Sequence, residues 1–347
     1  MKTLFSPFVS ARYGRSALFD NFNRIARILY RRRAYAKMVL HAAGRRVPLL
    51  NLIRTQFPFL LPDAGVPPQV TVEFTNLCNL KCVYCTNPLG LRPRGFMSVE
   101  TFTRLVQSIR DCGVDRVRVI GNGEPTLHPE FARFVGELAR ATRYVSVLTN
   151  GQWRSDEVVY AMLNAPVDLI ETSVDGMTEE DYEKSRIGGH FNTLLENLRQ
   201  LQEARRELRG SSLINIRLML RPSQRAVETQ LTGYWRQYAD AVMPQYVLKR
   251  PQLDYDEDVY TGLHLAAQSY PKCSLPFKDL GVNWNGDVPL CAGSAAQIGP
   301  PGLILGTINH HSLGELWNTQ IMRQYRAGHR DRQLEKIPIC KGCAVGC

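Results

Sequence analysis

From residue 70 onward, short apolar runs alternate with longer segments in which apolar residues recur every three or four positions. The helical periodicity predicts helices over 98–112, 129–141, 155–164, 190–209 and 223–239. The short β-branched runs predict strands at 70–74, 116–121, 144–150, 167–174, 213–220 and 241–248, the last interrupted by Pro244. Regular strand–helix alternation is typical of parallel strands joined by right-handed crossovers. We therefore expect an α/β fold, a partial (β/α)6 TIM-like barrel whose site lies at the carboxyl ends of the strands.

The first 69 residues follow a different pattern. Arginines surround a helical stripe of apolar residues formed by Leu18, Phe22, Ile25, Leu29, Ala36 and Val39. This segment holds twelve Lys and Arg against two acidic residues, a net +10 of the chain's +11, so residues 70–347 carry only +1. A basic amphipathic helix, followed by the apolar, proline-punctuated stretch 48–62, predicts binding to an anionic membrane surface.

Two other interpretations of this basic extension stay open. A helix packed on the outside of the barrel, with a solvated basic face, has the same pattern. Nucleic-acid binding is disfavoured, because stacking aromatic residues are sparse among the arginines. No uninterrupted apolar run reaches about 18 residues, so no transmembrane helix is expected.

Nine cysteines add chemistry to this picture. An odd number in short-spaced groups favours metal ligation in a reducing compartment over a disulfide framework. We expect a cytoplasmic protein, with the basic extension able to place it peripherally on the inner face of the membrane. Cys112 belongs to neither group and is interpreted as a buried structural thiol.

Three cysteines, Cys78, Cys82 and Cys85, follow the first expected strand at CxxxCxxC spacing. Three thiolates hold three corners of a [4Fe–4S] cube and leave one iron without a protein ligand, whereas a tetrahedral zinc site needs four ligands. With Tyr84 directly before the third cysteine, this loop resembles the cluster loop of the radical S-adenosylmethionine (SAM) superfamily. The resemblance implies that SAM chelates the open iron and is cleaved to a 5′-deoxyadenosyl radical. It also implies an external one-electron reductant such as flavodoxin or ferredoxin.

Other strand ends resemble the same family. GNGEP at 121–125 is similar to its GGEP loop, with Asn122 in place of a glycine, and a dinucleotide fingerprint is disfavoured because Thr126 stands where a third glycine is needed. Arg217, a charge within an apolar strand, would bind the methionine carboxylate; an arginine on a solvated strand face is the alternative. The remaining cofactor-binding residues implied by the resemblance are Gly121, Gly123, Glu124, Thr149, Asn150, Ser173 and Asp175, the last two facing the ribose.

The C-terminal cysteines form a second group. Cys273, a GxxxxC ending at Cys291, and the closing IPICKGCAVGC resemble the SPASM and Twitch modules, which carry auxiliary iron–sulfur clusters. The full SPASM module has seven cysteines and this region has five, which favours one auxiliary [4Fe–4S] cluster. The resemblance assigns its ligands as Cys273, Cys291, Cys340 and Cys343. Cys347 replaces one of them or is a spare thiol, and a zinc ribbon is the structural alternative.

The expected domains are therefore a basic extension at 1–69, a radical SAM barrel at 70–248 and a Twitch- or SPASM-like module at 249–347. The resemblance implies an oxidoreductase, and we expect it to dehydrogenate or epimerise a carbohydrate-like or lipid-linked small molecule. A peptide- or protein-modifying maturase is the first alternative, and a non-catalytic iron–sulfur or zinc protein is the second. Asp279, six residues after Cys273, is the candidate base for an oxidation step.

Overall fold

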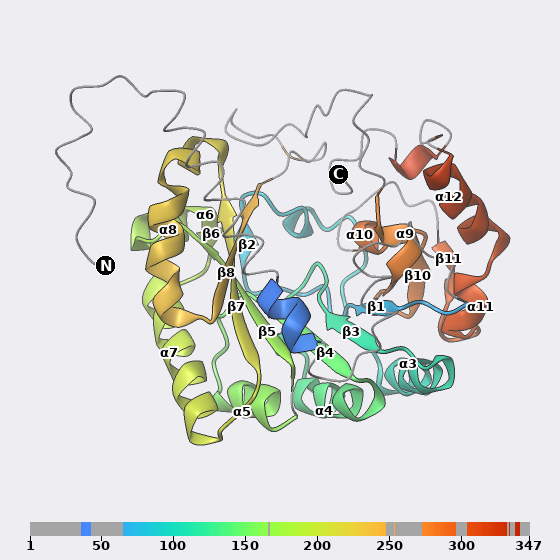
Figure 1. Ribbon diagram of the computed structural model, residues 1–347, viewed down its shortest axis with the longest axis horizontal. Helices are drawn as coiled ribbons and strands as arrows, with labels where there is room; N and C mark the ends of the chain where they lie inside the picture. Colours follow the sequence, from blue (N-terminus) through green and yellow to red (C-terminus); the bar gives the residue numbers. More distant parts are fainter. Residues whose placement is uncertain are drawn as a thin grey trace.

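The computed structural model describes residues 36–42, 65–165, 167–247, 253, 273–295, 304–331, 333 and 337–340. Its centre is a seven-stranded sheet in the order β8-β7-β5-β4-β3-β1-β9, and every pairing in it is parallel. Figure 1 shows the sheet curving as an open barrel, with its crossover helices along the outer side. The fold is thus the expected α/β partial barrel.

The strands of the sheet are β1 (Gln69–Val72), β3 (Arg116–Val119), β4 (Tyr144–Thr149), β5 (Leu169–Asp175), β7 (Leu213–Leu220), β8 (Ala241–Tyr246) and β9 (Asp279–Val282). The crossover helices are α3 (Val99–Cys112), α4 (Phe131–Ala141), α5 (Asp156–Asn164), α7 (Phe191–Glu207) and α8 (Glu228–Trp235). Short elements near the strand ends are β2 (Lys81–Cys82), η3 (Asn87–Leu89), η4 (Pro125–Leu127), α6 (Glu179–Ser185), β6 (Arg186–Ile187), η5 (Pro222–Val227) and η6 (Arg236–Tyr238). The C-terminal part contains α9 (Leu275–Lys278), β10 (Asp287–Pro289), α10 (Ala292–Ala295), β11 (Ile304–Thr307), α11 (Leu313–Trp317), α12 (Gln320–Arg330) and η8 (Pro338–Cys340).

Helix α3 illustrates how the sequence sets these boundaries. Ser98 precedes the helix in an extended conformation, and its side chain accepts a hydrogen bond from the Thr101 N–H. Gly113 ends the helix at φ 62°, a left-handed conformation that suits glycine. Between these caps, Phe102 and Leu105 lie on the buried face, and the Phe102 ring stacks on Phe134 of α4 with centroids 3.7 Å apart. The apolar stripe of each crossover helix thus packs against the sheet and the next helix.

The expected elements agree with the structure within a few residues, with one exception. The helix expected over 223–239 is divided into η5, α8 and η6. Pro222 lies in the first turn of η5, where a proline is tolerated. The tighter 3₁₀ geometry of that segment makes it a separate element from α8.

The seventh strand of the sheet comes from the C-terminal region. β9 pairs with β1 in a register that places Asp279 beside Gln69. This region also packs on α3, where the Leu313 N–H donates to the Ser108 hydroxyl at 2.8 Å. The C-terminal part therefore shares a core with the barrel. The expected domain boundary at 248–249 lies outside the described residues and stays a prediction.

A helix over residues 36–42 lies across the amino-terminal end of the barrel (Figure 1). Lys37 Nζ donates to the Asp240 carbonyl oxygen at 3.0 Å, and His41 Nε2 lies 2.8 Å from the Ser211 carbonyl oxygen. Ala42, 1% exposed, packs in a cluster with Tyr144 and Leu169, which begin β4 and β5. This part of the basic extension is thus a helix packed on the barrel, as one alternative proposed. Leu18, Phe22, Ile25 and Leu29 lie outside the described residues.

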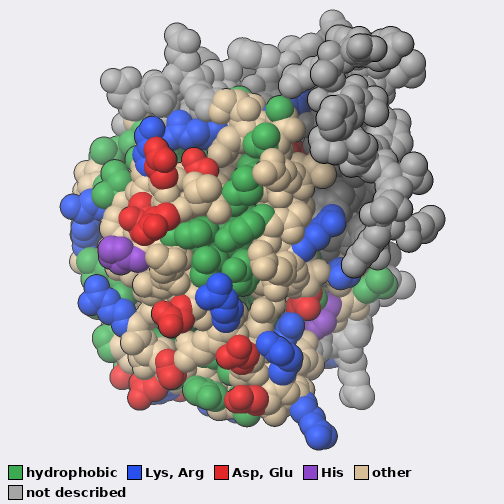
Figure 2. All heavy atoms as spheres, turned by 90° about the vertical axis from the view of Figure 1, so that its left-hand side faces the viewer, with side chains coloured by type: hydrophobic (Ala, Val, Ile, Leu, Met, Phe, Trp, Pro, Cys, Tyr) green, Lys and Arg blue, Asp and Glu red, His purple; other side chains and the backbone are tan. Residues whose placement is uncertain are grey.

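The surface and the helices add two observations about charge and membranes. Figure 2 shows acidic and basic side chains intermixed around a central group of apolar ones on the face that it presents, without an extended basic patch there. This mixture agrees with the net +1 of residues 70–347. Within the described residues, we find no helix with the length and apolar character needed to cross a membrane.

Candidate active site

The loop that follows β1 brings Cys78, Cys82 and Cys85 together. Backbone N–H groups point at two of the sulfur atoms: Leu80 N donates to Cys78 Sγ and Asn87 N to Cys85 Sγ, each at 3.4 Å. Burial raises the pKa of the Cys78 thiol to about 11 and that of Cys82 to about 12, and neighbouring thiols of the same loop contribute to both shifts. The three thiols therefore lie near enough to influence one another, and two of them accept backbone N–H donors. Among the described residues, however, no three Cys, His, Asp or Glu side chains are arranged closely enough to hold a metal ion.

A two-residue pairing fastens this loop to the segment that follows β5. β2 and β6 are antiparallel, with Lys81 beside Ile187 and Cys82 beside Arg186. The Val83 N–H extends the contact to the Ser185 carbonyl oxygen at 3.0 Å. The pairing fixes the middle cysteine relative to the carboxyl end of β5.

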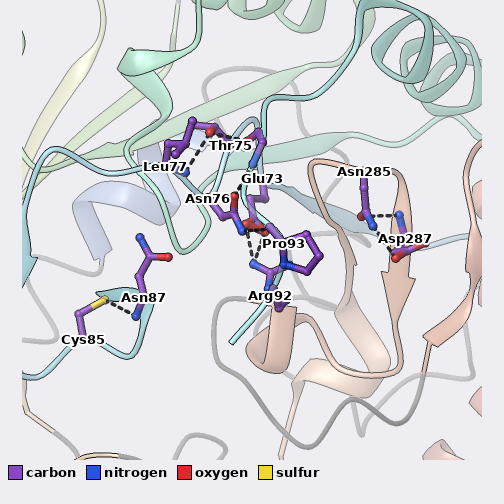
Figure 3. A network of polar contacts seen from close by, with 11 residues as sticks. Glu73, Thr75, Asn76, Leu77, Cys85, Asn87, Arg92, Pro93, Asn285 and Asp287 are labelled. Carbon is purple, nitrogen blue, oxygen red and sulfur yellow. Dashed lines mark hydrogen bonds and ion pairs between the residues drawn. The ribbon is translucent and has the colours of Figure 1, made fainter. Parts of the chain in front are cut away.

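The chain beyond the cysteines folds back over the end of β1 (Figure 3). Asn76 donates to the Pro93 carbonyl oxygen at 2.7 Å and accepts from the Gly95 N–H at 2.9 Å. Arg92 Nη2 contacts both carboxylate oxygens of Glu73, at 2.6 and 2.7 Å. Burial raises the pKa of Glu73, while the Arg92 guanidinium opposes that shift. The cysteine loop is thus held at its base by an ion pair with a buried carboxylate.

The GNGEP loop approaches the cysteine loop closely. The Glu124 N–H donates to the Leu77 carbonyl oxygen at 2.8 Å. A Cβ at Gly123 would lie 2.3 Å from that oxygen and 2.4 Å from the Thr75 carbonyl oxygen, and a Cβ at Gly121 would lie 2.4 Å from the Glu73 side chain. Both glycines are therefore required for the two loops to touch.

Glu124 joins this loop to the end of β4. Its carboxylate accepts hydrogen bonds from Thr149 Oγ1 at 2.7 Å, from the Asn150 N–H at 2.6 Å and from Thr126 Oγ1 at 2.7 Å. Burial raises the pKa of Glu124, and these donors oppose the shift. Asn150 then contacts the cysteine loop, donating to Asn79 Oδ1 at 2.8 Å and lying 3.8 Å from Cys78 Sγ. Glu124, Thr149 and Asn150 thus form one network beside the first cysteine.

Asp175, at the end of β5, accepts hydrogen bonds from several side chains and forms the centre of a second network. Its carboxylate accepts from Tyr84 Oη at 2.9 Å, from Arg186 Nε at 2.7 Å and from the Ser185 hydroxyl. Burial raises the pKa of Tyr84. Ser173 lies two residues earlier on the same strand, beside Arg217 of β7. These contacts connect the residue before Cys85 to the strand end expected to face the ribose.

Arg217 forms a bidentate ion pair within the barrel. Its Nε lies 2.8 Å from Glu171 Oε1, and its Nη2 lies 3.0 Å from Oε2. Arg217 lowers the pKa of Glu171 against the effect of burial, which raises it. The solvated-face alternative is thus replaced by a paired arginine on the inner face of the sheet, and its contact with the methionine carboxylate stays a prediction.

A pocket of about 360 Å³ lies at the carboxyl ends of β5 and β7. Asp175 and Ser185 form one wall beside Lys184 of α6, and Met219 and Arg221 form another. Because Asp175 also accepts from Tyr84, the pocket adjoins the cysteine loop. Its place at the strand ends is where a barrel enzyme of this class binds small ligands.

The described auxiliary cysteines lie in the C-terminal part. Cys340 Sγ is 3.3 Å from His329 Nε2 and 3.6 Å from Tyr325 Oη, both on α12. Cys291 also acts electrostatically on Tyr325. Burial raises the pKa of Tyr325, and the thiols of Cys291 and Cys340 raise it further. Cys273 precedes α9, whereas Cys343 and Cys347 lie outside the described residues. Cys112 is half-buried at the end of α3 and packs against the core.

Asp279 lies at the other end of the barrel from the cysteine loop. It is the first residue of β9 and accepts from Gln69 Nε2 at 2.8 Å and from Thr71 Oγ1 at 2.9 Å. Burial raises its pKa, and Arg118 opposes that shift. The structure therefore places this candidate base beside the beginning of β1, while the cysteines follow the end of β1.

Several residues of the site were absent from the sequence-based expectation. Glu73 and Arg92 anchor the cysteine loop, Arg186 pairs with Asp175, and Glu171 pairs with Arg217. One available signal is the alternation of β1 and β5, in which Glu73 and Glu171 share a face with other polar residues. The identity of their partners depends on tertiary contacts, which the periodicity does not contain.

The residues at this site fit the cluster and cofactor that the motifs imply. The three grouped thiols offer three soft ligands, and N–H donors to sulfur are a usual means of tuning such clusters. At Gly121 and Gly123 an added Cβ would clash with neighbouring atoms, so only glycine lets the GNGEP backbone lie against the cysteine loop. The polar backbone groups of GNGEP therefore lie beside the cofactor site.

Comparison with known proteins identifies two domains. The model of the radical SAM superfamily matches residues 72–221, and the SPASM iron–sulfur cluster-binding domain matches residues 273–344. The PqqA peptide cyclase of Methylorubrum extorquens (strain PA1) is 26% identical over 310 residues, which cover 80% of this chain and 77% of the relative. The GTP 3′,8-cyclase of Vibrio atlanticus (strain LGP32) is 34% identical over 113 residues, 30% of this chain and only 33% of the relative.

A solved structure extends the similarity to three dimensions. Native anSMEcpe with bound AdoMet and the Cp18Cys peptide superposes with a TM-score of 0.58 at 16% identity, covering 79% of this chain and 88% of that chain. At this identity the similarity concerns the fold. It agrees with the parallel barrel and its C-terminal extension.

Proposed function

Because this chain is a radical SAM enzyme with a C-terminal SPASM module, we propose that its substrate is a peptide or protein. The observation that carries the proposal is the match to a PqqA peptide cyclase over 80% of this chain and 77% of that relative. The structural neighbour with a bound peptide supports the same substrate class. The GTP cyclase, whose name gives a nucleotide substrate, matches over a third of its own length.

The expected carbohydrate-like or lipid-linked substrate therefore has weaker support than the peptide alternative. For a peptide substrate, the proposed reaction is dehydrogenation or epimerisation of a carbon, or the cyclisation that the relative's name gives. The non-catalytic alternative is set aside, since the chain combines the cysteine loop with the GNGEP loop of the radical SAM family.

The chain's own residues bind and orient the reactants. When bound, the [4Fe–4S] cluster and SAM supply a 5′-deoxyadenosyl radical that removes a hydrogen atom from the substrate. Cys78, Cys82 and Cys85 hold the cluster at the carboxyl end of β1, and the Glu124 network fixes the GNGEP backbone beside them. Asp175 stands between Tyr84 and the pocket at the end of β5, in a position suited to a ribose.

Two finer assignments belong to this proposal. One auxiliary [4Fe–4S] cluster is ligated by Cys273, Cys291, Cys340 and Cys343, with Cys347 as a substitute ligand. Asp279 acts as a base, for which a pKa raised by burial is suitable. Asp279 lies at the other end of the barrel from the cysteine loop. In that role it would therefore receive the proton through other side chains of the inner face.

Two partners complete the proposal. An external one-electron reductant such as flavodoxin or ferredoxin supplies the electron for the cluster, because an iron–sulfur cluster carries electrons but does not generate them. An anionic membrane surface binds the basic extension. Of residues 1–64, the structure describes only 36–42, where Leu40 is 71% exposed on the helix that covers the barrel.

The substrate class is tested by fractionation. The anaerobically reconstituted enzyme, given SAM and dithionite, is incubated with the peptide, lipid and soluble carbohydrate fractions of a cell extract, and 5′-deoxyadenosine is measured. We expect the peptide fraction to stimulate its formation and to lose that effect after protease digestion. Stimulation by the lipid or carbohydrate fraction, unchanged by protease, would contradict the proposal.

A further inference from the structure

The inner face of the barrel sheet is charged. Strand alternation places Val117 and Val119 of β3 in the core beneath the helices, so Arg116 and Arg118 face inward. The same alternation makes an inner face of polar side chains from five strands. Its members are Gln69, Thr71, Arg116, Arg118, Glu171, Asn215, Arg217 and Asp279.

Both acidic residues that act electrostatically on Arg118 already have direct partners. Glu171 accepts two hydrogen bonds from Arg217 and a third from Asn215 at 3.0 Å. Asp279 accepts from Gln69 and Thr71. Within the described residues, neither carboxylate forms an ion pair with Arg118 within 4.0 Å.

Arg118 is the group left over. Within the described ranges, it makes no hydrogen bond and no ion pair within 4.0 Å, although Arg217, Glu171, Asp279 and Arg116 all act on it electrostatically. Burial is the largest influence on the pKa of Arg118 and lowers it, with Arg217 next. An arginine nevertheless keeps its charge at neutral pH. Its side chain is only partly buried, so a small ligand can reach it.

No described acidic side chain neutralises Arg118 directly. Glu171 is paired with Arg217, and Asp279 accepts from Gln69 and Thr71 without an ion pair to Arg118 within 4.0 Å. An enclosed guanidinium without a partner is costly, and an anion that forms two parallel hydrogen bonds with it removes that cost. The lack of a direct partner for Arg118 among the described residues therefore favours a negatively charged ligand on the inner face.

We propose that the inner face binds a carboxylate of the substrate through Arg118. This inference rests on the proposed peptide substrate, for which the group is an Asp or Glu side chain or a C-terminal carboxylate. The helix over 36–42 covers the amino-terminal end of the barrel, so the carboxylate enters from the end that carries the cysteine loop. Arg118 precedes Gly121 by three residues, about 10 Å along a strand. It would therefore contact a part of the substrate that lies farther into the barrel than the GNGEP loop.

Thermal unfolding of the reconstituted enzyme tests this site without a peptide. The probe is glutarate at about 20 mM, compared with neutral glutaramide and with inorganic phosphate at constant ionic strength. We expect glutarate to raise the Tm of the wild type by about 2 °C or more, and glutaramide to leave it unchanged. Arg118→Met should abolish the glutarate shift. Arg104→Met, which removes an exposed arginine of α3, should retain it.

The remaining outcomes separate the possible failures. An equal glutarate shift in Arg118→Met, or no shift in the wild type, overturns the site, and a shift with phosphate alone overturns its carboxylate specificity. If Arg118→Met does not fold, Arg118→Lys keeps the charge without the planar fork, and we expect a reduced but detectable shift. A glutarate shift that depends on Arg118, in an enzyme that modifies no peptide, would leave this site standing while rejecting the peptide substrate.

Discussion

Close backbone contacts at single glycines determine how the active-site loops meet. At Gly123, the neighbours of a new Cβ would be two carbonyl oxygens of the cysteine loop, which cannot rotate away as a flexible side chain can. Such a contact is relieved only by separating the loops. Because Gly123 has only a hydrogen atom in place of a Cβ, it allows the spacing between the cysteine loop, which binds the cluster, and the GNGEP loop, which binds the cofactor.

Gly123→Ala should therefore weaken SAM binding while leaving the iron content of the protein nearly unchanged. We expect the SAM affinity to fall at least about tenfold, equivalent to about 1.4 kcal/mol, because the loop must move to accommodate the methyl group. Equilibrium binding of SAM to the reconstituted protein measures this. Gly136→Ala in α4, where the nearest atom to the new Cβ is 3.6 Å away, is the matched control and should bind SAM normally. Equal affinities for the wild type and Gly123→Ala would contradict the close-contact argument.

His128 is a buried group whose protonation should affect stability. Its Nε2 donates to the Met97 carbonyl oxygen at 2.9 Å, while its Nδ1 accepts from the Glu130 N–H at 3.0 Å. Burial lowers its pKa below the ordinary value of about 6.5, so the folded state favours the neutral ring. The stabilisation is complete above that value and is lost as pH falls toward the folded pKa, at up to about 1.4 kcal/mol per pH unit.

The measurement is the Tm of the reconstituted protein between pH 7.5 and 5.5. We expect His128→Gln, which keeps a donor but does not titrate, to lose less Tm than the wild type over this range. Parallel curves for the two proteins would show that another group controls the pH dependence.

At the scale of elements, the helix over 36–42 acts as a cover for the barrel. Ala42 contacts the first residues of β4 and β5, whereas Leu40 on the same helix is 71% exposed. Ala42→Glu would force a carboxylate into that contact, at a cost of about 1–3 kcal/mol for an unpaired buried polar group. We expect a lower Tm and faster proteolysis near residue 36.

Leu40→Glu is the control on this helix, since an exposed substitution changes stability by about 0.5 kcal/mol or less. If both variants behaved like the wild type, the helix would not be firmly seated on the barrel.

The elements also show where sequence reasoning succeeds and where it stops. β7 has the predicted bounds because eight residues of LINIRLML provide enough alternation to define a strand. β2 and β6 have two residues each, too few for any period, and β9 has four. The three cysteines were predictable from local spacing, whereas Glu73–Arg92 and Asp175–Arg186 depend on which segments fold together. Arg118 could be recognised as unpaired only after the partners of Glu171 and Asp279 were known.

For the whole molecule, the number of clusters is the first expected quantity. The reconstituted protein should hold about eight irons, as two [4Fe–4S] units. Replacing Cys78, Cys82 and Cys85 by Ala should leave about four irons and abolish 5′-deoxyadenosine formation under dithionite. Iron and sulfide analysis checks both values. About four irons in the wild type would remove the auxiliary site, and about twelve would indicate a third cluster.

The basic extension makes a second prediction for the whole molecule. The full chain should bind anionic vesicles, and binding should weaken with salt because charge attraction fades within a Debye length of about 8 Å at physiological ionic strength. A chain beginning at residue 35 keeps the helix over the barrel but loses eight of the twelve basic residues of 1–69, and it should bind more weakly. Neutral vesicles serve as the control. Equal binding of both chains, or binding indifferent to salt, would contradict an electrostatic membrane contact.

The pairing of β1 with β9 has a consequence for how the chain matures on the ribosome. Gln69 and Asp279 are 210 residues apart, so the edge of β1 that pairs with β9 stays open until residues 279–282 have been synthesised. At about 5–20 residues per second, that interval lasts about 10–40 s, during which the cysteine loop is already outside the tunnel beside an open strand edge. Insertion of iron and sulfide into that loop therefore has a period in which the barrel is still incomplete, and this period ends when β9 pairs with β1.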